Sequence, residues 1–184
     1  MRRNDRFSLA EVTGTARCGM SLVLTRWVAL SGTVQLLNEH GEVLRQALPQ
    51  TLIDQAFSFS EILSDFSDTE VAVRCGVASF CESGPGGIYH ALWDLAAASG
   101  VGVEAYMDAI PIRQETVEIC EVLDMDPYKL DSRGCLLMAC QDPEPVCEAF
   151  FAKGIEASVI GCVTEGKDRV IITGGTKRFI SPRE

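Results

Sequence analysis

The feature that most constrains this chain is a glycine-rich turn between a strand-like run and a helical run. The run from Val71 to Ser79 is apolar enough for a strand, and the turn after it reads Phe80-Cys81-Glu82-Ser83-Gly84-Pro85-Gly86-Gly87. Ile88 then opens a helical run that reaches Ser99. Such a turn presents the first amides of the helix, and an oxyanion is their natural ligand. The glycines also suit tight turning and close packing, so the turn has a purely structural interpretation as well.

The turn is the candidate ligand site. We expect it to bind phosphate or a nucleotide, with the backbone amides of Gly86, Gly87 and Ile88 as the main donors. Replacing the first of these glycines by a β-branched residue is expected to block close approach of the ligand. The predicted site residues are Glu82, Ser83, Gly84, Gly86, Gly87 and Ile88.

Reactive side chains near the turn have two interpretations. A helix N-terminus lowers a thiol pKa, which makes Cys81 a candidate nucleophile, but inert packing is the favoured interpretation. His90 could serve as an acid or base, whereas with Tyr89 and Trp93 it more often lines a helix–sheet packing surface. The sequence therefore assigns no catalytic residue.

Composition excludes several classes of protein. The 184 residues are 47% hydrophobic and 23% charged, which suits one globular unit with a sizeable core. The net charge of -10 argues against a nucleic-acid partner. The apolar run from Met20 to Leu30 is short and contains Arg26, so no membrane segment is predicted. An acidic cytoplasmic protein is the expectation.

The cysteines do not predict a metal site. No two are spaced as Cys-x-x-Cys, and His40 and His90 do not supply missing ligands. Reduced thiols used as small apolar side chains are the favoured interpretation. The eight cysteines stand at positions 18, 75, 81, 120, 135, 140, 147 and 162.

Hydrophobic periodicity predicts alternating strands and helices, and hence an α/β (α+β) fold with one mixed sheet and helices on both faces. A hairpin through Glu165–Asp168 is expected to join the last two strands, and a glutamate-rich helix face around Glu115, Glu118 and Glu121 is expected to be solvated. The predicted strands are 21–29, 71–79, 102–106, 134–140, 158–163 and 169–173. The predicted helices are 34–48, one or two within 51–65, a turn at 68–74, 88–99, one opened by Pro111, and one from Pro143 to Gly154.

An ordered series of segments resembles the C-terminal domain of the aminoimidazole ribonucleotide synthase superfamily, with a branch similar to the hydrogenase maturation dehydratases. The resemblance runs over roughly residues 20 to 175. It is carried by Gly86–Ala96, Ala98–Glu104, Ile110–Ile112, Glu115–Leu123, Gly134–Ala139, Gly154–Ala157 and Val159–Thr164.

The resemblance implies a two-domain enzyme whose N-terminal domain makes most ATP and magnesium contacts and whose C-terminal domain closes the cleft. That first domain has no counterpart here, so the resemblance implies a module with no cofactor by itself, and ATP with magnesium only beside a partner domain. The family turn reads Asp-x-Thr-x-Gly-Gly, whereas Glu82 and Gly84 replace its acid and its hydroxyl. The terminal cysteine that receives the carbamoyl group in the dehydratases has no counterpart in Phe179–Glu184.

Two functions follow from the resemblance. One is a noncatalytic binding or assembly module with a weak phosphate or nucleotide site. The alternative is a subunit of an ATP-dependent enzyme, completed by a separate N-terminal ATP-binding partner, that phosphorylates an amide or carbonyl oxygen. Because a missing companion leaves apolar surface uncovered, we expect a homo-oligomer or an N-terminal-domain-like protein partner. The expected organisation is a leader at 1–19, a domain at 20–175 and a polar tail at 176–184.

Overall fold

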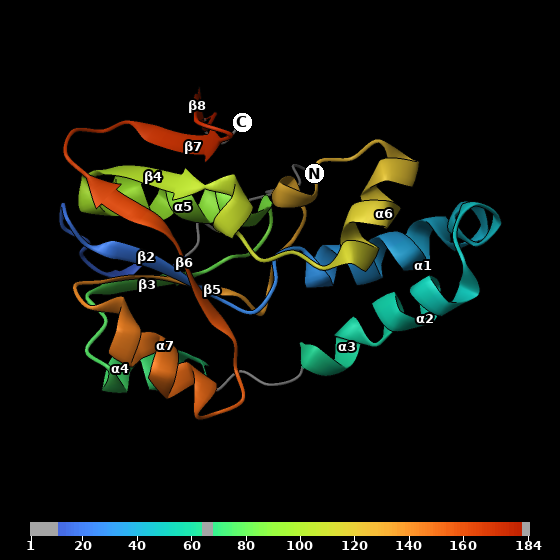
Figure 1. Cartoon of the computed structure of the whole chain (residues 1–184), viewed down its shortest axis with the longest axis horizontal. Helices are drawn as coiled ribbons and strands as arrows, with labels where there is room; N and C mark the ends of the chain where they lie inside the picture. Colours follow the sequence, from blue (N-terminus) through green and yellow to red (C-terminus); the bar gives the residue numbers. More distant parts are fainter. Residues whose placement is uncertain (1–10, 64–67, 182–184) are drawn as a thin grey trace, which may run out of the picture.

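A computed structural model describes residues 11–63 and 68–181 (Figure 1). The N-terminal part of the expected leader and residues 182–184 of the expected tail lie outside the described residues. The strands are β1 (Thr13–Gly14), β2 (Ser21–Thr25), β3 (Ser79–Glu82), β4 (Gly102–Tyr106), β5 (Leu136–Cys140), β6 (Ala157–Thr164), β7 (Arg169–Thr173) and β8 (Thr176–Phe179). The helices are α1 (Leu30–Ala47), α2 (Gln50–Phe57), α3 (Phe59–Ile62), α4 (Asp68–Arg74), α5 (Gly87–Ser99), α6 (Gln114–Leu123) and α7 (Pro143–Phe151), with 3₁₀ turns η1 (Met107–Ala109) and η2 (Pro127–Lys129).

The strands form one eight-stranded mixed sheet in the order β1-β3-β5-β2-β6-β4-β7-β8. The β4–β7 pair is parallel and the other pairs are antiparallel. Helix α5 covers one face, where Leu92 and Leu95 pack with strand residues such as Leu22. Helices α4 and α7 cover part of the other face, where Val71 and Phe150 join the second core. The mixed sheet with helices on both faces is confirmed.

A third core lies among helices α1, α2, α3 and α6, which stand together at one side of the sheet (Figure 1). Leu37, Leu44, Ile53 and Phe59 are buried there. Glu115, expected on a solvated face, is instead 9% exposed and pairs with Arg113, with Nε and Oε2 3.4 Å apart. The prediction of a fully solvated glutamate face is wrong because the first turn of α6 lies against this helical core.

The prediction of a strand at 71–79 is wrong over most of that range. Residues up to Arg74 are helix α4, and the sheet strand is Ser79–Glu82. Val71 and Ala72 are buried while Val73 is 62% exposed, so the helix directs neighbouring residues to different environments. Packing against α7 outweighs the strand preference of the β-branched residues.

The expected hairpin of the last two long strands is also wrong. Strand β4 lies between β6 and β7 and pairs with both. Gly161 allows this approach, because an added Cβ would lie 2.0 Å from the Glu104 carbonyl oxygen. The turn at 165–168 thus carries the chain across β4 and does not join paired strands.

Two strands extend the sheet beyond residues 20–175. Strand β1 pairs with β3 at one edge, and β8 pairs with β7 at the other, within the stretch expected to be a polar tail. Strand β2 ends at Thr25, short of the predicted Ala29, because Arg26 has a left-handed backbone with φ 59°. The predicted strand at 102–106 and the helix ending at Ser99, with Gly100 at its C-cap, are confirmed.

No helix among the described residues has the length and apolar character needed to cross a membrane.

Candidate functional site

The glycine-rich turn connects the end of β3 to the start of α5, as the sequence predicts for residues beyond Ser79. Gly86 is the N-cap residue of α5 with φ 85°, and Gly87 begins the helix with φ 67°. Both values are unfavourable for residues with a Cβ. The local conformation therefore explains why glycine stands at these two positions.

The start of α5 is covered by the segment after α6. A Cβ added to Gly87 would lie 2.3 Å from the Tyr128 carbonyl oxygen and 2.7 Å from that of Leu130. Gly87 N–H also donates to the Gly84 carbonyl oxygen at 3.0 Å. Of the three predicted donors, the Gly87 amide is thus already used inside the turn, and carbonyl oxygens rather than solvent lie beside it.

Burial divides the six predicted site residues into two groups. Ser83, Gly87 and Ile88 are buried, whereas Gly84 and Gly86 are half-buried and Glu82 is exposed. The structure brings all six together in one turn. Gly84 and Gly86 are thus more accessible than the first residues of α5.

The Ser83 hydroxyl is a buried polar group without a hydrogen-bond partner among the described residues. Its backbone N–H donates to the Cys135 carbonyl oxygen at 2.9 Å. Buried hydroxyls are usually satisfied, so an unsatisfied one inside a candidate site is consistent with a ligand or water contact there. This hydroxyl stands one position before the Gly84 that replaces the family threonine.

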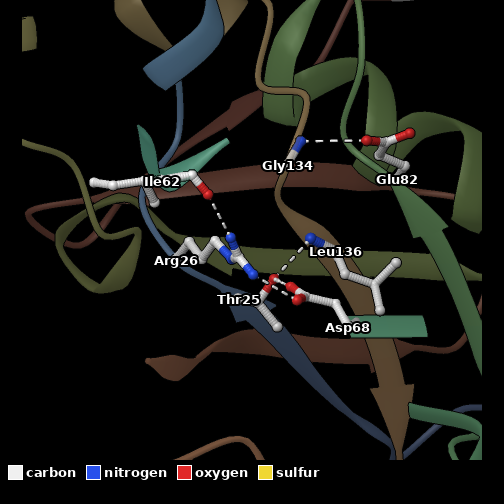
Figure 2. Close-up of polar contacts among 7 residues, drawn as sticks. All are labelled: Thr25, Arg26, Ile62, Asp68, Glu82, Gly134 and Leu136. Carbon is white, nitrogen blue, oxygen red and sulfur yellow. Dashed lines mark hydrogen bonds and ion pairs between the residues drawn. The ribbon is translucent and has the colours of Figure 1, made fainter. Parts of the chain in front are cut away.

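Glu82 is tied to the neighbouring loop. Its Oε1 accepts a hydrogen bond from Gly134 N–H at 3.2 Å, at the entry to β5 (Figure 2). A carboxylate here repels a phosphate, and backbone amides do not bind cations. In the described parts of the chain, no group of three His, Cys, Asp or Glu residues is placed to hold a metal ion.

Tyr89, in the first turn of α5, contacts a tyrosine and an arginine from later segments of the chain. The Tyr89 and Tyr128 rings stack with centroids 5.9 Å apart, and Arg178 donates to the Tyr89 hydroxyl at 3.0 Å. Burial, together with the charge of Asp126, raises the pKa of Tyr89 to about 12. The Tyr89 hydroxyl is therefore neutral at physiological pH.

His90 packs against the turn. A Cβ on Gly86 would lie 1.7 Å from its Nδ1, so the imidazole occupies the space that the glycine leaves. Cys81 is 1% exposed, and its thiol donates to the Ala91 carbonyl oxygen at 3.7 Å. Both placements favour the packing interpretation of these side chains.

A buried polar cluster beside the site was not predicted from the sequence. Arg26 and Asp68 form an ion pair with Nη2 and Oδ1 2.7 Å apart, and the two side chains are 6% and 9% exposed. Thr25 Oγ1 donates to Asp68 Oδ2 at 2.9 Å, and Arg26 Nη1 donates to the Ile62 carbonyl oxygen at 2.9 Å (Figure 2). The cluster joins the end of β2 to α3 and α4.

The same cluster reaches the loop before β5, where the Gly134 N–H bonds to the Glu82 carboxylate. Leu136 N–H donates to Thr25 Oγ1 at 2.9 Å, two residues after Gly134 (Figure 2). Between them, the Cys135 thiol donates to the Trp27 carbonyl oxygen at 2.9 Å, and complete burial raises its pKa. A charged residue inside the apolar run from Met20 to Leu30 was the sequence signal for this cluster.

Comparison with known proteins gives a family match that includes the residues of the candidate site. The family model described as AIR synthase related protein, C-terminal domain, matches residues 69–173, more than half of the chain. The chain belongs to this family. The match contains the whole glycine-rich turn, helix α5 and the strands from β3 to β7.

Several curated relatives of the chain are hydrogenase maturation proteins. Carbamoyl dehydratase HypE of Azotobacter vinelandii is 36% identical over 90 residues, 47% of this chain and 26% of the relative. HypE of Escherichia coli is 27% identical over 161 residues, 82% of this chain and 46% of the relative. The chain thus spans less than half the length of these relatives.

Solved structures confirm the fold. The crystal structure of E. coli HypE has a TM-score of 0.69 and 23% identity, over 92% of this chain and 52% of that one. T. maritima PurL complexed with ATP has a TM-score of 0.63 and 16% identity, over 92% of this chain and 26% of that one. This chain therefore shares its fold with parts of HypE and PurL.

Proposed function

We propose that this chain is a binding or assembly module that is not catalytic by itself, with a weak phosphate or nucleotide contact at the glycine-rich turn. The observation that carries the proposal is the covered start of α5, where the Gly87 amide is already bonded and the carbonyls of Tyr128 and Leu130 lie close. A helix end closed in this way offers few free donors to an anion.

The contact is assigned to the outer side of the turn. Gly84 and Gly86 are half-buried and within reach of a ligand, and the Ser83 hydroxyl is a donor available beneath them. Glu82 opposes the negative charge of a phosphate. A helix dipole at such a site adds only about 0.3–1 kcal/mol to the hydrogen bonds of the turn, so weak binding in the millimolar range is expected.

The second candidate is a subunit of an ATP-dependent enzyme that a separate N-terminal-domain-like partner completes. It is favoured by structural neighbours solved with ATP, a HypE and T. maritima PurL, of which this chain matches 52% and 26%. In that case the partner supplies the magnesium ligands and most of the ATP contacts. The turn would then add a phosphate contact, and the reaction would be phosphorylation of an amide or carbonyl oxygen.

Calorimetry with ATP and magnesium, combined with an assay for ADP release, separates the two candidates. For the chain alone we expect a dissociation constant in the millimolar range and no ADP. Adding an N-terminal half from a HypE relative gives tight ATP binding and turnover only under the second candidate. Micromolar ATP binding with ADP release by the chain alone would contradict both.

Replacing Gly86 with Val should abolish the weak binding, because the new side chain displaces the His90 imidazole and strains the left-handed backbone, and so distorts the outer side of the turn. Phosphate titration by calorimetry measures the loss. Cys81→Ser is the matched control, since its side chain is buried and should leave binding nearly unchanged. Circular dichroism of both variants checks that the fold is kept. Retained phosphate affinity in Gly86→Val would remove the turn from the site.

A further inference from the structure

Strand β8 is a free edge of the sheet among the described residues. It stands last in the strand order and pairs only with β7, and in Figure 1 it lies beyond β7. All four residues of Thr176–Phe179 are exposed. An exposed edge strand presents unpaired backbone groups to another extended chain. The outer edge of β8 is therefore a surface to which a further strand can be added.

The hydrogen-bond register defines which backbone groups of β8 face outward. Ile180 N–H donates to the Arg169 carbonyl oxygen at 2.8 Å, so these two residues form a hydrogen-bonded pair that continues the β7–β8 ladder. In antiparallel strands such pairs alternate with non-hydrogen-bonded pairs. Phe179 and Lys177 occupy pairs of the second kind. Each of these two residues thus directs its N–H and its C=O away from β7, at the outer edge.

The hairpin of β7 and β8 is basic, although the whole chain has a net charge of -10. Residues 169–181 contain Arg169, Lys177 and Arg178 and no aspartate or glutamate. Lys177 is neutralised by Glu104, with which it forms an ion pair. Neither arginine forms an ion pair in the part of the chain that the structure describes. Two guanidinium charges therefore remain uncompensated in this hairpin.

Both arginines lie on the sheet face that α5 covers. Arg178 is opposite Ile171, which packs in the core beneath α5, and Arg169 precedes Ile171 by two positions on the same strand. Arg169 stacks on Trp93, with 4.0 Å from Cζ to the ring centroid, and Arg178 donates to the Tyr89 hydroxyl at 3.0 Å. These contacts with uncharged groups hold the two side chains in place without neutralising them.

We infer that the outer edge of β8 binds an extended segment of another protein in which acidic and apolar residues alternate. Successive residues of an added strand project to opposite faces of the sheet. Its acidic side chains lie beside Arg178 on one face, and its apolar side chains lie beside Phe179, which is 68% exposed, on the other. Backbone hydrogen bonds provide the affinity, and the alternating side chains provide the specificity. The inference gives a partner class to the assembly role proposed above and rests on that role.

A second copy of this chain does not have the required charge. Strand β8 carries Lys177 and Arg178 and no acid, and like charges on neighbouring strands are destabilising. The basic edge therefore opposes the pairing of two β8 strands and favours the addition of an acidic strand.

A capped, fluorescently labelled hexapeptide of alternating glutamate and valine is the probe for the full chain. Fluorescence anisotropy should give a dissociation constant of about 10 μM to 1 mM, and at least about tenfold weaker binding when lysine replaces glutamate in the peptide. Arg178→Glu should weaken binding of the acidic peptide at least about tenfold, because it reverses the charge beside the added strand. Arg45→Glu is the matched control, since Arg45 is exposed in the last turn of α1 and should leave binding unchanged. Equal affinity for the two peptides, or equal affinity of the two variants, would overturn the inference.

Two substitutions at Phe179 test the backbone contact. Phe179→Pro removes an outward N–H, whereas Phe179→Val keeps it, so the proline variant should bind the acidic peptide at least about tenfold more weakly than the valine variant. Circular dichroism checks that both variants are folded. Equal binding by the two folded variants would overturn the inference.

Amide chemical shifts of the unsubstituted, isotopically labelled chain locate the peptide without any change to the fold. The largest shifts on adding the acidic peptide are expected at Lys177 and Phe179. Shifts confined to the glycine-rich turn, or no binding at all, would overturn this inference. Either failure is distinct from a failure of the proposed function, because titration of the same sample with phosphate tests the turn separately.

Discussion

Replacing Asp68 with Ala should lower the free energy of unfolding by about 3–5 kcal/mol, because it removes the carboxylate from a buried ion pair. Arg26 stays 6% exposed and loses its partner at 2.7 Å, and Thr25 Oγ1 loses its acceptor. For a chain of this size the midpoint of thermal unfolding should fall by roughly 10 °C. Denaturant unfolding followed by circular dichroism measures the change.

Glu70→Ala is the matched control on the same helix. Glu70 pairs with Arg74 at 3.3 Å, but both side chains are at least 70% exposed. Exposed pairs of this kind contribute about 0.3–0.5 kcal/mol. A loss below about 1 kcal/mol in Asp68→Ala, or equal losses in the two variants, would show that the buried cluster does not hold α4 to the end of β2.

Replacing Gly87 with Ala should destabilise the protein by about 2–5 kcal/mol. The left-handed backbone with φ 67° costs roughly 1–2 kcal/mol for a residue with a Cβ, and forcing an atom into a packed site costs about 1–3 kcal/mol more. The obstruction is backbone, since the Tyr128 carbonyl oxygen would lie 2.3 Å from the new Cβ. Equilibrium denaturation by urea gives the difference.

Gly84→Ala tests the same turn without these two costs. A Cβ at Gly84 meets no heavy atom within 4 Å in the described structure, and its φ is not in the left-handed region. The change should be neutral or stabilising by about 0.4–1 kcal/mol. Similar unfolding free energies for the two alanine variants would mean that η2 does not pack over the start of α5 as described.

The sequence predicted correctly those elements in which the hydrophobic periodicity and the residues that end the element indicate the same structure. The helix ending at Ser99 has a continuous apolar face followed by Gly100, and the strand at 102–106 follows directly. The hairpin prediction was wrong because the turn residues between β6 and β7 carry no information on the position of β4. Strand β4 comes earlier in the chain and lies between these two strands. Strand order is a non-local property that adjacent turns do not encode.

The candidate site was predictable in its place but not in its surroundings. The spacing of Gly84, Gly86 and Gly87 located the turn between strand and helix, as the structure has it. The segment that covers the helix start lies some forty residues later, and its contact uses the backbone carbonyl of Tyr128. Because every residue has a backbone carbonyl, no pattern of side chains in the sequence predicts this contact. The Arg26–Asp68 pair also joins residues far apart in the sequence. An arginine in an apolar run indicates that a buried partner exists, but it does not indicate which residue that partner is.

The most direct test of the weak anion contact is a phosphate titration of the isotopically labelled chain, followed by the chemical shifts of its backbone amides. We predict a midpoint in the millimolar range, with the largest shifts at Gly84 and Gly86 on the outer side of the turn. Shifts confined to another part of the molecule, with the turn unchanged, would contradict the site. A micromolar midpoint would contradict the claim that the start of α5 is closed.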